Sequence, residues 1–381
     1  MLVVSQCFAP NVGGVETHLT DLTKQIRDRN LPTTILTYQP LVTKARAPLR
    51  EIDGSVTIYR LPWIGFGLFN KLEPYPALQF LYLFPVLFIA AFFYMLFKSP
   101  CISAIHAHGM VCAAIVHYLK KVFGTRTVIS IHAVYGWLYK LDDKSILPRF
   151  LKKILSSADK VLCLAERSRE EIIALGVPPE NTGTFTYWID LNVFRKMDTA
   201  ECRKKVGIPA DKFTVLFVGR LIDVKGVSLL IDAAKEMPDI NFVFAGDGPL
   251  AAKLAGIKTK TGNIIYNGKV NNTDLPSFYS AADVLCVPSQ YEEGFGRIII
   301  EALACGCPVI ATNRGGIPEA MDSTVGILIE QGYAPLREAI AELKTNRARL
   351  SAMKANTRKF AEQRYSSRNV EKIVEAYRLT N

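Results

Sequence analysis

The sequence predicts an α/β protein with two doubly wound parallel-sheet domains, and three observations support this class. Short apolar strands alternate with helical segments along the whole chain. The run Phe213–Val218 is almost continuously apolar, as in strands that are buried on both faces. Glycine turns repeatedly follow such strands, at Gly13-Gly14, at Gly246 and at Gly294. Two domains are expected because 381 residues are enough for two complete cores.

Composition narrows the classes of partner. Hydrophobic residues make up 49% of the chain and charged residues 21%, which is typical of a globular protein. The net charge is +11, and the excess of basic residues is spread over both halves of the chain. A basic surface favours nucleotide phosphates, anionic lipid or nucleic acid. No helix-turn-helix, zinc or RNA-binding motif accompanies it, so we expect no nucleic-acid partner.

The eight cysteines and the start of the chain indicate a cytoplasmic protein. Only Cys305 and Cys307 lie close in sequence, and their spacing is too tight for a zinc site. We therefore expect reduced thiols. The chain opens directly on the apolar strand Leu2–Ser5, and we expect no signal peptide.

The first domain is expected to begin with that strand, a glycine turn and a helix to about Arg29. Gly13-Gly14 can let the backbone approach a phosphate, or it can form a tight turn into the helix. Glu16 lies in the first turn of this helix. Further strands are predicted at Thr33–Thr37 and Val56–Arg60.

The segment Leu78–Phe97 is unusually apolar. It has no charged residue, and Gln79 is its only strongly polar one. Its length would allow it to cross a membrane. The strands before and after it are expected in one sheet, however, and a single crossing would separate them. We therefore favour two alternatives over a spanning helix. One is a crossover helix packed on the sheet, and the other is a helix whose exposed side lies in the membrane interface, near Lys71, Lys98, Lys120 and Lys121.

Two histidines mark the ends of later strands. Strand Ser103–Ala107 is followed by His108, and strand Thr127–Ile131 ends at His132. The carboxyl ends of strands are the ligand side of an open α/β sheet. We expect only one of His106 and His108 to face that side, and choose His108, for which ordinary packing is the alternative. For His132 we predict a functional role.

We place the domain boundary between Thr184 and Phe194. The first domain then covers residues 1–190 and the second residues 191–365. A terminal helix in 366–381 is expected to pack back on the first domain. Trp188 lies just before the boundary, close to the expected ligand edge.

The second domain carries two cations after its first strand. Gly219 and Arg220 follow Phe213–Val218 directly, and Lys225 comes five residues after Arg220. Both cations can reach one anion from this strand tip, although two exposed basic residues on a loop are the alternative. Gly246 marks the tip of the next strand, Asn241–Ala245.

The stretch Ser289–Thr312 reads as strand end, glycine loop, helix, cap and strand. Gly294 and Gly296 let the backbone turn tightly and approach a ligand. The helix that follows begins with unpaired N–H groups at its positive dipole end, which suit an anion. Glu293 and Glu301 are acceptors for sugar hydroxyls. Together these features suggest a nucleotide-sugar.

This stretch resembles the carboxyl-terminal signature of retaining glycosyltransferases of family 4, which have the GT-B fold. In that signature Gly-Phe-Gly follows a first glutamate, and seven residues separate this glutamate from a second one. Glu293 and Glu301 fit this pattern. The Gly-Arg-Leu and Lys-Gly of 219–226, and the Gly-Gly pairs at 13–14 and 315–316, match further. The resemblance covers nearly the whole chain and implies two Rossmann-like domains facing each other across a cleft.

The resemblance also implies roles for individual residues. Glu293 would contact the donor sugar, and Glu301 would hold the ribose hydroxyls. Arg220 and Lys225 would stabilise the departing diphosphate. Arg297, at the helix start, would add a phosphate contact or face solvent. The catalytic candidates are thus His132, Glu293, Arg220 and Lys225; the donor-binding candidates are Gly13, Gly14, Gly219, Gly246, Gly294, Phe295, Gly296, Arg297 and Glu301; the acceptor-side candidates are Glu16, His108 and Trp188.

The implied reaction is retaining transfer of a sugar from a UDP- or GDP-linked donor to a hydroxyl acceptor. The apolar segment 78–97 favours a lipid-linked or cell-envelope acceptor and a peripheral location on the inner face of the membrane. We expect neither a metal nor another cofactor, since Gly246-Asp247-Gly248 is not an Asp-x-Asp motif and Asp142-Asp143 lacks a third ligand. The alternatives are a catalytically idle nucleotide-sugar-binding subunit of a glycan assembly and a nucleotide-sugar epimerase of the same fold.

Overall fold

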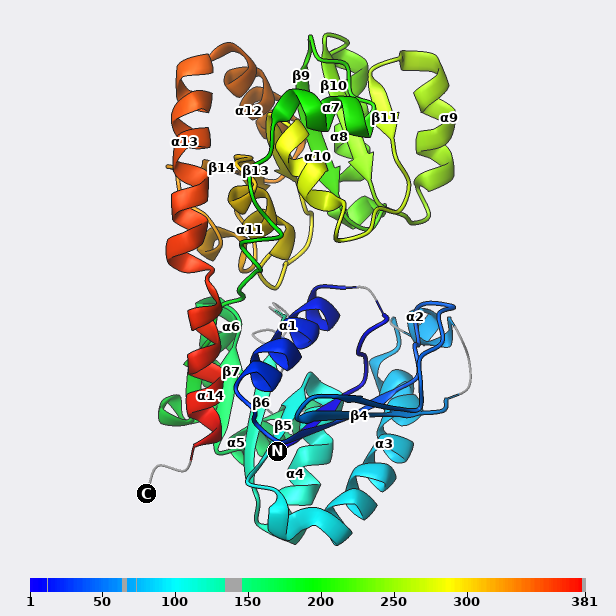
Figure 1. Ribbon diagram of the computed structural model, residues 1–381, viewed down its shortest axis with the longest axis vertical. Coiled ribbons are helices and arrows are strands. Elements are labelled where there is room, and N and C mark those ends of the chain that lie inside the picture. Colours follow the sequence, from blue (N-terminus) through cyan, green and yellow to red (C-terminus); the bar gives the residue numbers. More distant parts are fainter. Residues whose placement is uncertain (12, 64–66, 73, 134–145, 379–381) are drawn as a thin grey trace. The chain divides into compact units, whose positions relative to one another are not determined.

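The computed structural model describes residues 1–381 except 12, 64–66, 73, 134–145 and 379–381. The chain forms two compact units (Figure 1). Unit 1 comprises Met1–Trp188 together with Ser367–Asn381, and unit 2 comprises Ile189–Ser366. These boundaries lie within two residues of the expected ones. Each unit contains one largely parallel sheet with helices on both faces, so the predicted α/β class with two such domains is confirmed.

Unit 1 is built on eight strands. They are β1 (Leu2–Ser5), β2 (Thr33–Tyr38), β3 (Arg50–Asp53), β4 (Val56–Leu61), β5 (Ala104–His108), β6 (Arg126–Ile131), β7 (Lys160–Cys163) and β8 (Thr182–Thr184). Their order in the sheet is β3-β4-β2-β1-β5-β6-β7-β8, and only the edge strand β3 runs antiparallel to its neighbour. The chain changes direction across the sheet between β1 and β5, which pair in parallel. Ligands of doubly wound sheets bind at such a point, beyond the carboxyl ends of the strands.

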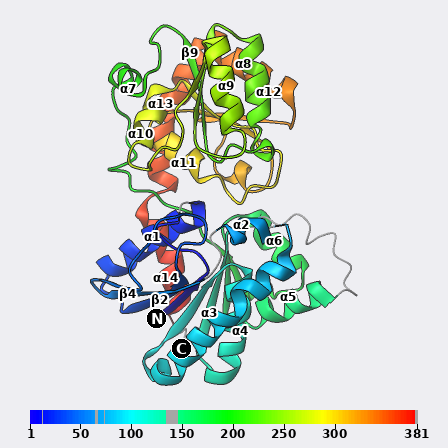
Figure 2. The ribbon, with the colours of Figure 1, turned by 90° about the vertical axis from the view of Figure 1, so that its right-hand side faces the viewer.

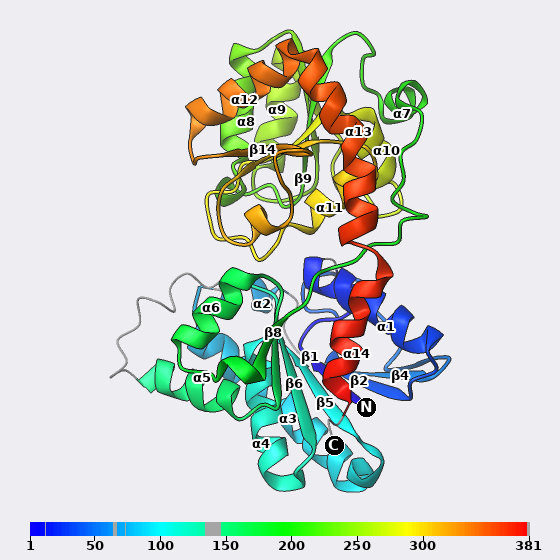
Figure 3. The same ribbon diagram turned by 90° about the vertical axis from the view of Figure 1, so that its left-hand side faces the viewer.

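The helices of unit 1 cover both faces of this sheet. They are α1 (Gly14–Asp28), α2 (Leu68–Leu72), α3 (Pro76–Lys98), α4 (Met110–Phe123), α5 (Ile146–Ser156), α6 (Glu166–Ala174) and α14 (Glu371–Tyr377). Helices α3, α4 and α5 lie side by side on one face (Figure 2), and α1 and α14 lie on the other (Figure 3). Alternate strand residues such as Leu2, Val4, Ile105 and Ala107 form a core with α3 and α4. The intervening strand residues face α1 and α14.

Helix α3 contains the apolar segment 78–97 and extends two residues before it and one beyond. Leu83, Leu87, Ala91 and Met95 recur at every fourth position and are fully buried against the core. The segment 77–101 is long and apolar enough to cross a membrane, yet only 22% of its most apolar window is buried. The helix therefore packs on the sheet along one stripe, and most of its surface is not covered by unit 1.

Unit 2 is a six-stranded parallel sheet. Its strands are β9 (Phe213–Val218), β10 (Ile240–Ala245), β11 (Ile264–Tyr266), β12 (Val284–Val287), β13 (Val309–Thr312) and β14 (Gly326–Ile329). The order β11-β10-β9-β12-β13-β14 is that of a dinucleotide-binding sheet, with its change of direction between β9 and β12. The helices are α7 (Thr199–Val206), α8 (Val227–Glu236), α9 (Ala251–Thr261), α10 (Leu275–Ala281), α11 (Arg297–Ala304), α12 (Tyr333–Thr345) and α13 (Arg347–Arg364).

The end of the chain differs from the sequence-based expectation in one respect. The terminal helix α14 starts only at Glu371, after a 3-10 turn over Ser367–Val370. No side chain of the described residues caps the start of α14. The segment nevertheless belongs to unit 1, where the Tyr377 hydroxyl lies 2.7 Å from His106 Nδ1 and Arg126 Nε donates to the Ala376 carbonyl at 3.0 Å.

Candidate functional site

Two loops meet at the change of direction in the sheet of unit 2. One follows β9 and contains Gly219 to Gly226, and the other follows β12 and contains Ser289 to Gly296. Gly226 has a left-handed φ of 77°, and a Cβ there would lie 2.1 Å from the Pro288 carbonyl oxygen. The Gln290 amide also donates to the Val224 carbonyl at 2.7 Å. The two loops are thus held together by backbone contacts that require glycine at position 226.

Glu293 is held at this junction by two donors. Lys225 Nζ lies 2.5 Å from Glu293 Oε1, and the Ser289 hydroxyl donates to the same oxygen at 2.6 Å. The Glu293 side chain is 10% exposed and that of Lys225 is 22% exposed. Lys225 Nζ also lies 5.0 Å from the centre of the Tyr291 ring. The predicted sugar-contacting carboxylate therefore lies beside the predicted diphosphate lysine, and Oε2 is the oxygen not used by these two donors.

Glu301 is held by a second pair of donors on α11. Arg297 Nε donates to Oε1 at 3.1 Å from one helical turn earlier, and the Tyr279 hydroxyl of α10 donates to Oε2 at 2.9 Å. Both members of the ion pair are buried, with side-chain exposures of 8% for Arg297 and 5% for Glu301. Burial, and next the charge of Glu301, raise the pKa of Tyr279 well above its usual value, so the phenol stays a hydrogen-bond donor. The expectation that Arg297 might face solvent is wrong, because its guanidinium is paired inside the unit.

Glycines bring further backbone into close contact around this edge. A Cβ at Gly246 would lie 1.8 Å from the Gly219 carbonyl oxygen, and one at Gly315 would lie 2.2 Å from the Glu293 carbonyl oxygen. The Gly316 amide donates to that Glu293 oxygen at 2.8 Å. The Gly315 amide donates to the carboxylate of Glu292 at 2.7 Å. The loop after β13 thereby fixes the backbone on which Glu293 stands.

The remaining predicted residues of unit 2 fall into two groups. Arg220 is exposed, and it makes no side-chain hydrogen bond or ion pair with any residue that the structure describes. Gly294 and Gly296 are half-buried, and Gly296, with φ of 84°, precedes the first turn of α11. Phe295, in contrast, is 3% exposed, and its ring packs edge-on against Tyr365 at 6.0 Å. Its side chain belongs to the core, so only its backbone is available to a donor.

The glycine loop of unit 1 is more open than those of unit 2. Gly14 is the first residue of α1, and a Cβ there would meet nothing within 4 Å. A Cβ at Gly13 would lie 2.3 Å from Glu16 Oε2, which is the end of a flexible side chain. Burial raises the pKa of Glu16 above its usual value. The pair Gly13-Gly14 thus leaves space beside a partly buried carboxyl.

A cluster of histidines lies beyond β5 and β6. His108 Nδ1 and His132 Nε2 are joined by a hydrogen bond of 2.9 Å, and His132 Nδ1 lies 3.0 Å from the Tyr187 hydroxyl. His106 and His108 share one face of β5, with ring centres 4.0 Å apart. The expectation that only one of them faces the ligand side is therefore wrong, because side chains two residues apart on a strand point to the same face.

These histidines are held neutral. Burial lowers the pKa of His132 to about 3. Burial, and to a smaller extent the nearby His132, lowers the pKa of His106 to about 3 as well. Burial and the neighbouring histidines also lower the pKa of His108 well below its usual value. A neutral imidazole has one N–H, so His132 donates one of its two hydrogen bonds and accepts the other. Both ring nitrogens of His132 are thus used within unit 1, and His108 Nε2 is a buried atom without a partner among the described residues.

Trp188 does not line an open edge. Its side chain is 2% exposed, and its ring packs edge-on against His18 at 4.9 Å. The expectation that it lies beside the ligand, where it could affect acceptor choice, is not supported by this burial. Its position is explained by packing, since unit 1 ends here and the aromatic ring closes the histidine cluster.

Three residues of these arrangements were not singled out from the sequence. They are His18, Ser289 and Tyr279. His18 packs on Tyr187 and His132 with ring centres 4.8 and 5.3 Å apart. The chain has only five histidines, and four of them gather here. That scarcity was the available signal for His18, whereas Tyr279 comes from a helix that no motif marks.

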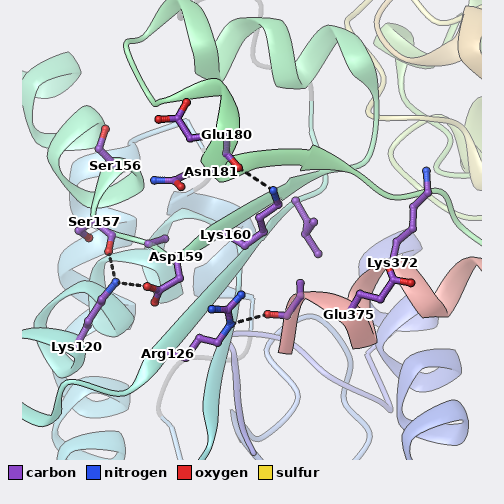
Figure 4. A pocket seen from close by; sticks show the side chains of 13 residues that line it. Lys120, Arg126, Ser156, Ser157, Asp159, Lys160, Glu180, Asn181, Lys372 and Glu375 are labelled. Carbon is purple, nitrogen blue, oxygen red and sulfur yellow. Dashed lines mark hydrogen bonds and ion pairs between the residues drawn. The ribbon is translucent and has the colours of Figure 1, made fainter. Parts of the chain in front are cut away.

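A polar pocket lies at the opposite edge of the sheet of unit 1 (Figure 4). Arg126 and Lys160 line it from the amino-terminal ends of β6 and β7. Lys120 is paired with Asp159 at 2.8 Å, and Lys160 Nζ donates to the Glu180 carbonyl at 2.9 Å. None of the predicted site residues lines this pocket, and its cations are largely matched by carboxylates and carbonyls.

No group of three or more His, Cys, Asp or Glu side chains within the described parts of the chain is placed to hold a metal ion. Asp142 and Asp143 lie outside the described residues.

Two family profiles match this chain in sequence. Residues 13–188 match the glycosyl transferase 4-like domain, and residues 198–360 match the glycosyl transferases group 1. A D-inositol 3-phosphate glycosyltransferase of Catenulispora acidiphila is 29% identical over 301 residues, which is 72% of each chain. The enzyme of that name from Mycobacterium tuberculosis is 32% identical over 189 residues, which is 47% of this chain and 39% of the mycobacterial one.

Solved structures share the fold over nearly the whole chain. Anabaena HepE in complex with UDP superposes with a TM-score of 0.75 at 21% identity, and the match covers 98% of both chains. Sucrose-phosphate synthase from Thermosynechococcus elongatus gives a TM-score of 0.80 at 21% identity, covering 99% of this chain and 97% of that one. At this identity the likeness shows a common fold.

Proposed function

Since this chain belongs to the group 1 glycosyltransferases and is a nucleotide-sugar-dependent hexosyltransferase with the GT-B fold, we propose that it moves a hexose from a UDP- or GDP-linked donor to a hydroxyl acceptor with retention of configuration. The observation that carries the proposal is the pair of held carboxylates at the edge of unit 2. Glu293 is oriented by Lys225 and Ser289, and Glu301 by Arg297 and Tyr279.

The proposed donor site uses the carboxylates as hydrogen-bond acceptors for hydroxyls. Glu301 would take the ribose hydroxyls, and Glu293 would orient the sugar through its second oxygen, Oε2. Each carboxylate is already fixed by two donors, so little rotamer entropy is lost on binding. The exposed Arg220 and the first amides of α11 would bind the diphosphate, since a guanidinium fork and a helix amino terminus both suit phosphate.

In this proposal the role of Lys225 differs from the one that the resemblance implies. Its ammonium lies on Glu293 in the free protein, rather than in open solvent beside Arg220. It would neutralise Glu293 beside a donor that carries two negative phosphates, and it would lie close enough to share its charge with the leaving diphosphate. The cations of this chain thus supply the positive charge at the leaving group, and we include metal-independent transfer in the proposal.

The proposed reaction needs no side-chain nucleophile. The acceptor oxygen forms a bond to the anomeric carbon on the face from which the diphosphate leaves, while the bond from that carbon to the phosphate oxygen breaks. The acceptor proton passes to an oxygen of the leaving diphosphate. The neutral histidine cluster with His132 and His108 suits an uncharged hydroxyl acceptor near Gly13-Gly14 and Glu16, because it adds no charge beside the acceptor.

We further propose that the acceptor is lipid-linked and that the protein works at the inner face of a membrane. Support comes from α3, whose outward side chains are apolar over the length of the helix. An enzyme whose acceptor is anchored in a bilayer gains from docking on that bilayer, since docking confines both to one surface.

Nucleotide binding tests the donor site first. Thermal shift of the full chain is measured with UDP, GDP and ADP, with Arg220→Ala and Glu301→Gln as variants. We expect stabilisation by one uridine or guanosine diphosphate, and smaller shifts in both variants. The solved neighbour HepE binds UDP and UDP-glucose, which supports uridine as the base to test first.

Transfer is then assayed with the matching nucleotide-sugar, with and without EDTA, and the anomeric configuration of the product is read by NMR. Retention and full activity in EDTA are expected. An inverted product would refute the mechanism, and loss of activity in EDTA would refute metal independence. Donor binding without transfer to any hydroxyl acceptor would favour an idle sugar-nucleotide-binding subunit.

A further inference from the structure

Helix α3 has an outward stripe that is as apolar as its buried one. Leu78, Leu81, Ile89, Phe93 and Phe97 are 53%, 66%, 53%, 54% and 76% exposed. Their spacing of three, eight, four and four residues keeps them on one side of the helix, opposite the buried stripe that begins at Leu83. An ordinary surface helix carries polar residues on that side. We call this set the α3 stripe.

The apolar surface continues on to the neighbouring helices. Tyr118 of α4 packs edge-on against Phe84 and Phe88 of α3 with ring centres 6.1 and 6.2 Å apart, and it remains 39% exposed. Val122, one turn later, is 61% exposed. Phe150 of α5 packs against Phe80 of α3 at 6.3 Å. The three helices lie side by side as one layer on unit 1 (Figure 2). Apolar side chains of this layer remain exposed.

The three helices of this layer are positively charged and contain no acidic residue. Helices α3, α4 and α5 contain no Asp or Glu, and they carry six cations. Lys121 extends over the Tyr118 ring, with Nζ 5.8 Å from its centre. Lysines that border an apolar surface can keep their charge in the headgroup region while their stems cover apolar atoms. The cations are Lys98, Lys120, Lys121, Arg149, Lys152 and Lys153. Of these, Lys120 is paired with Asp159 at 2.8 Å.

Helix α3 cannot cross a bilayer as a single span. It connects β4 to β5, and both strands lie in the one sheet of unit 1. Its inner side chains are fully buried against that sheet. One side of the helix is therefore committed to unit 1, and only the other side is left for a partner.

We propose that the α3 stripe and the basic border formed by α4 and α5 are a docking surface for an anionic lipid bilayer, on which α3 lies in the plane of the interface. An apolar stripe with a basic border and no acid complements acyl chains below and negative headgroups around it. A protein partner of the same size would need acidic groups around an apolar patch, and a second copy of this chain would bring two positively charged surfaces together.

The proposal also fixes where a lipid-linked acceptor would enter, and this part rests on the proposed function. Helix α3 runs antiparallel to the strands, so its amino-terminal end, with Leu78 and Leu81, lies towards the carboxyl ends of β4 and β2. Tyr38, at the end of β2, donates from its hydroxyl to the Leu83 carbonyl at 2.5 Å. An acceptor headgroup would thus approach Gly13-Gly14 and the histidine cluster from this end of the docked helix.

Vesicle co-sedimentation of the full chain tests the surface. Binding is measured to phosphatidylcholine vesicles with and without phosphatidylglycerol. We expect binding that requires phosphatidylglycerol and weakens with salt. The variant Leu81→Ser/Ile89→Ser/Phe93→Ser should lower the bound fraction about tenfold or more, and Lys121→Gln/Lys152→Gln/Lys153→Gln should do the same.

Matched controls test whether vesicle binding depends on this surface or on exposed apolar and basic side chains in general. Leu49→Ser/Ile52→Ser changes side chains of unit 1 that are 58% and 61% exposed but lie outside the helix layer, and Lys204→Gln/Lys253→Gln/Lys359→Gln removes three exposed lysines of unit 2. Both should bind vesicles as the unchanged chain does. No binding to anionic vesicles, or equal loss in the controls, would overturn the proposal. So would a dimer in solution that the α3 serine variant dissociates.

The same variants are assayed for nucleotide binding and for transfer to a detergent-solubilised acceptor. Retention of both in the α3 serine variant shows that it is folded and that the donor site is independent of the surface. Vesicle binding with no nucleotide binding would overturn the proposed function and leave the surface intact. Nucleotide binding with no vesicle binding would overturn the docking surface and leave the proposed function intact.

Discussion

The two units present different chemistry at the same topological position. In unit 2 the carboxyl ends of β9 and β12 carry ion pairs, Lys225 with Glu293 and, on the following helix, Arg297 with Glu301. In unit 1 the ends of β5 and β6 carry neutral rings, with His108 hydrogen-bonded to His132. One edge is built from charges and the other from uncharged polar groups.

Under the proposed function, this difference would suit two kinds of ligand on one fold. A diphosphate is bound by charge, so its site needs fixed cations and carboxylates that are already paired. A hydroxyl acceptor is uncharged, and a neutral edge avoids the cost of burying charge. The glycine loops of the two units differ as well. Gly246 and Gly315 of unit 2 lie close to other backbone atoms, whereas Gly14 of unit 1 faces open space.

Acid should have the largest effect on this comparison, because the histidines of unit 1 stay neutral when folded and take up protons only when the unit unfolds. The pKa values of His106 and His132 are about 3 in the folded chain and about 6.5 when unfolded. Below about pH 6.5 the unfolded state binds protons that the folded state does not, so stability falls as pH drops towards 3. Together the two histidines should cost unit 1 about 3 kcal/mol at about pH 5.5.

Urea unfolding between neutral pH and about pH 5.5, followed by hydrogen exchange to resolve the units, measures this effect. We expect unit 1 to lose stability before unit 2, and His132→Asn to reduce the pH dependence of unit 1. Equal losses in both units would show that the histidines are not held neutral.

Removing one member of a buried ion pair should destabilise unit 2. Glu301→Ala leaves the 8% exposed Arg297 side chain without its carboxylate, which should lower the free energy of unfolding by about 3 kcal/mol and abolish nucleotide binding. The double variant Arg297→Leu/Glu301→Leu should recover much of the stability, because no charge is left buried. Nucleotide binding should stay absent in it. Recovered binding would show that Glu301 does not contact the donor.

Removing the Arg220 side chain should weaken nucleotide binding without changing the stability of unit 2. It is exposed and makes no described side-chain contact, so Arg220→Ala should leave the free energy of unfolding unchanged within about 0.5 kcal/mol. Loss of its contact with a diphosphate should cost about 2 kcal/mol of binding, or about thirtyfold in Kd. Titration calorimetry measures this, with the exposed Arg195→Ala of unit 2 as the matched control. Equal Kd values for the two variants would remove Arg220 from the site.

Tyr279 should have the smallest effect of the four. Tyr279→Phe removes the hydroxyl that donates to Glu301 Oε2 and leaves the Arg297 pair in place. We expect about 1 kcal/mol of weaker nucleotide binding, or about fivefold, because Glu301 then loses one of the donors that orient it. Tyr365→Phe removes another buried hydroxyl of unit 2, one that donates to the Ala320 carbonyl at 2.6 Å, and serves as the control.

The regular elements were predictable because their patterns are local. Strands such as β9 (Phe213–Val218) and β2 (Thr33–Tyr38) lie where their apolar runs predicted them, and the glycine turns marked the strand ends. The short edge strands β3, β8 and β14 were missed. Arg50–Asp53 is charged and Thr182–Thr184 contains a glycine, so neither carries a strand pattern, and each forms only because a neighbouring strand offers it hydrogen bonds.

The sequence by itself determined the fold class, the family resemblance and the carboxylates and cations that could bind a donor, since these depend on residue type and spacing along the chain. Only the tertiary structure decided which groups meet. It paired Lys225 with Glu293, buried Arg297 on Glu301, enclosed Trp188 and gathered four histidines from α1, β5 and the end of β6. It also decided which side of α3 is covered, because a helix that is apolar all round carries no mark of its inner face until a sheet packs against it.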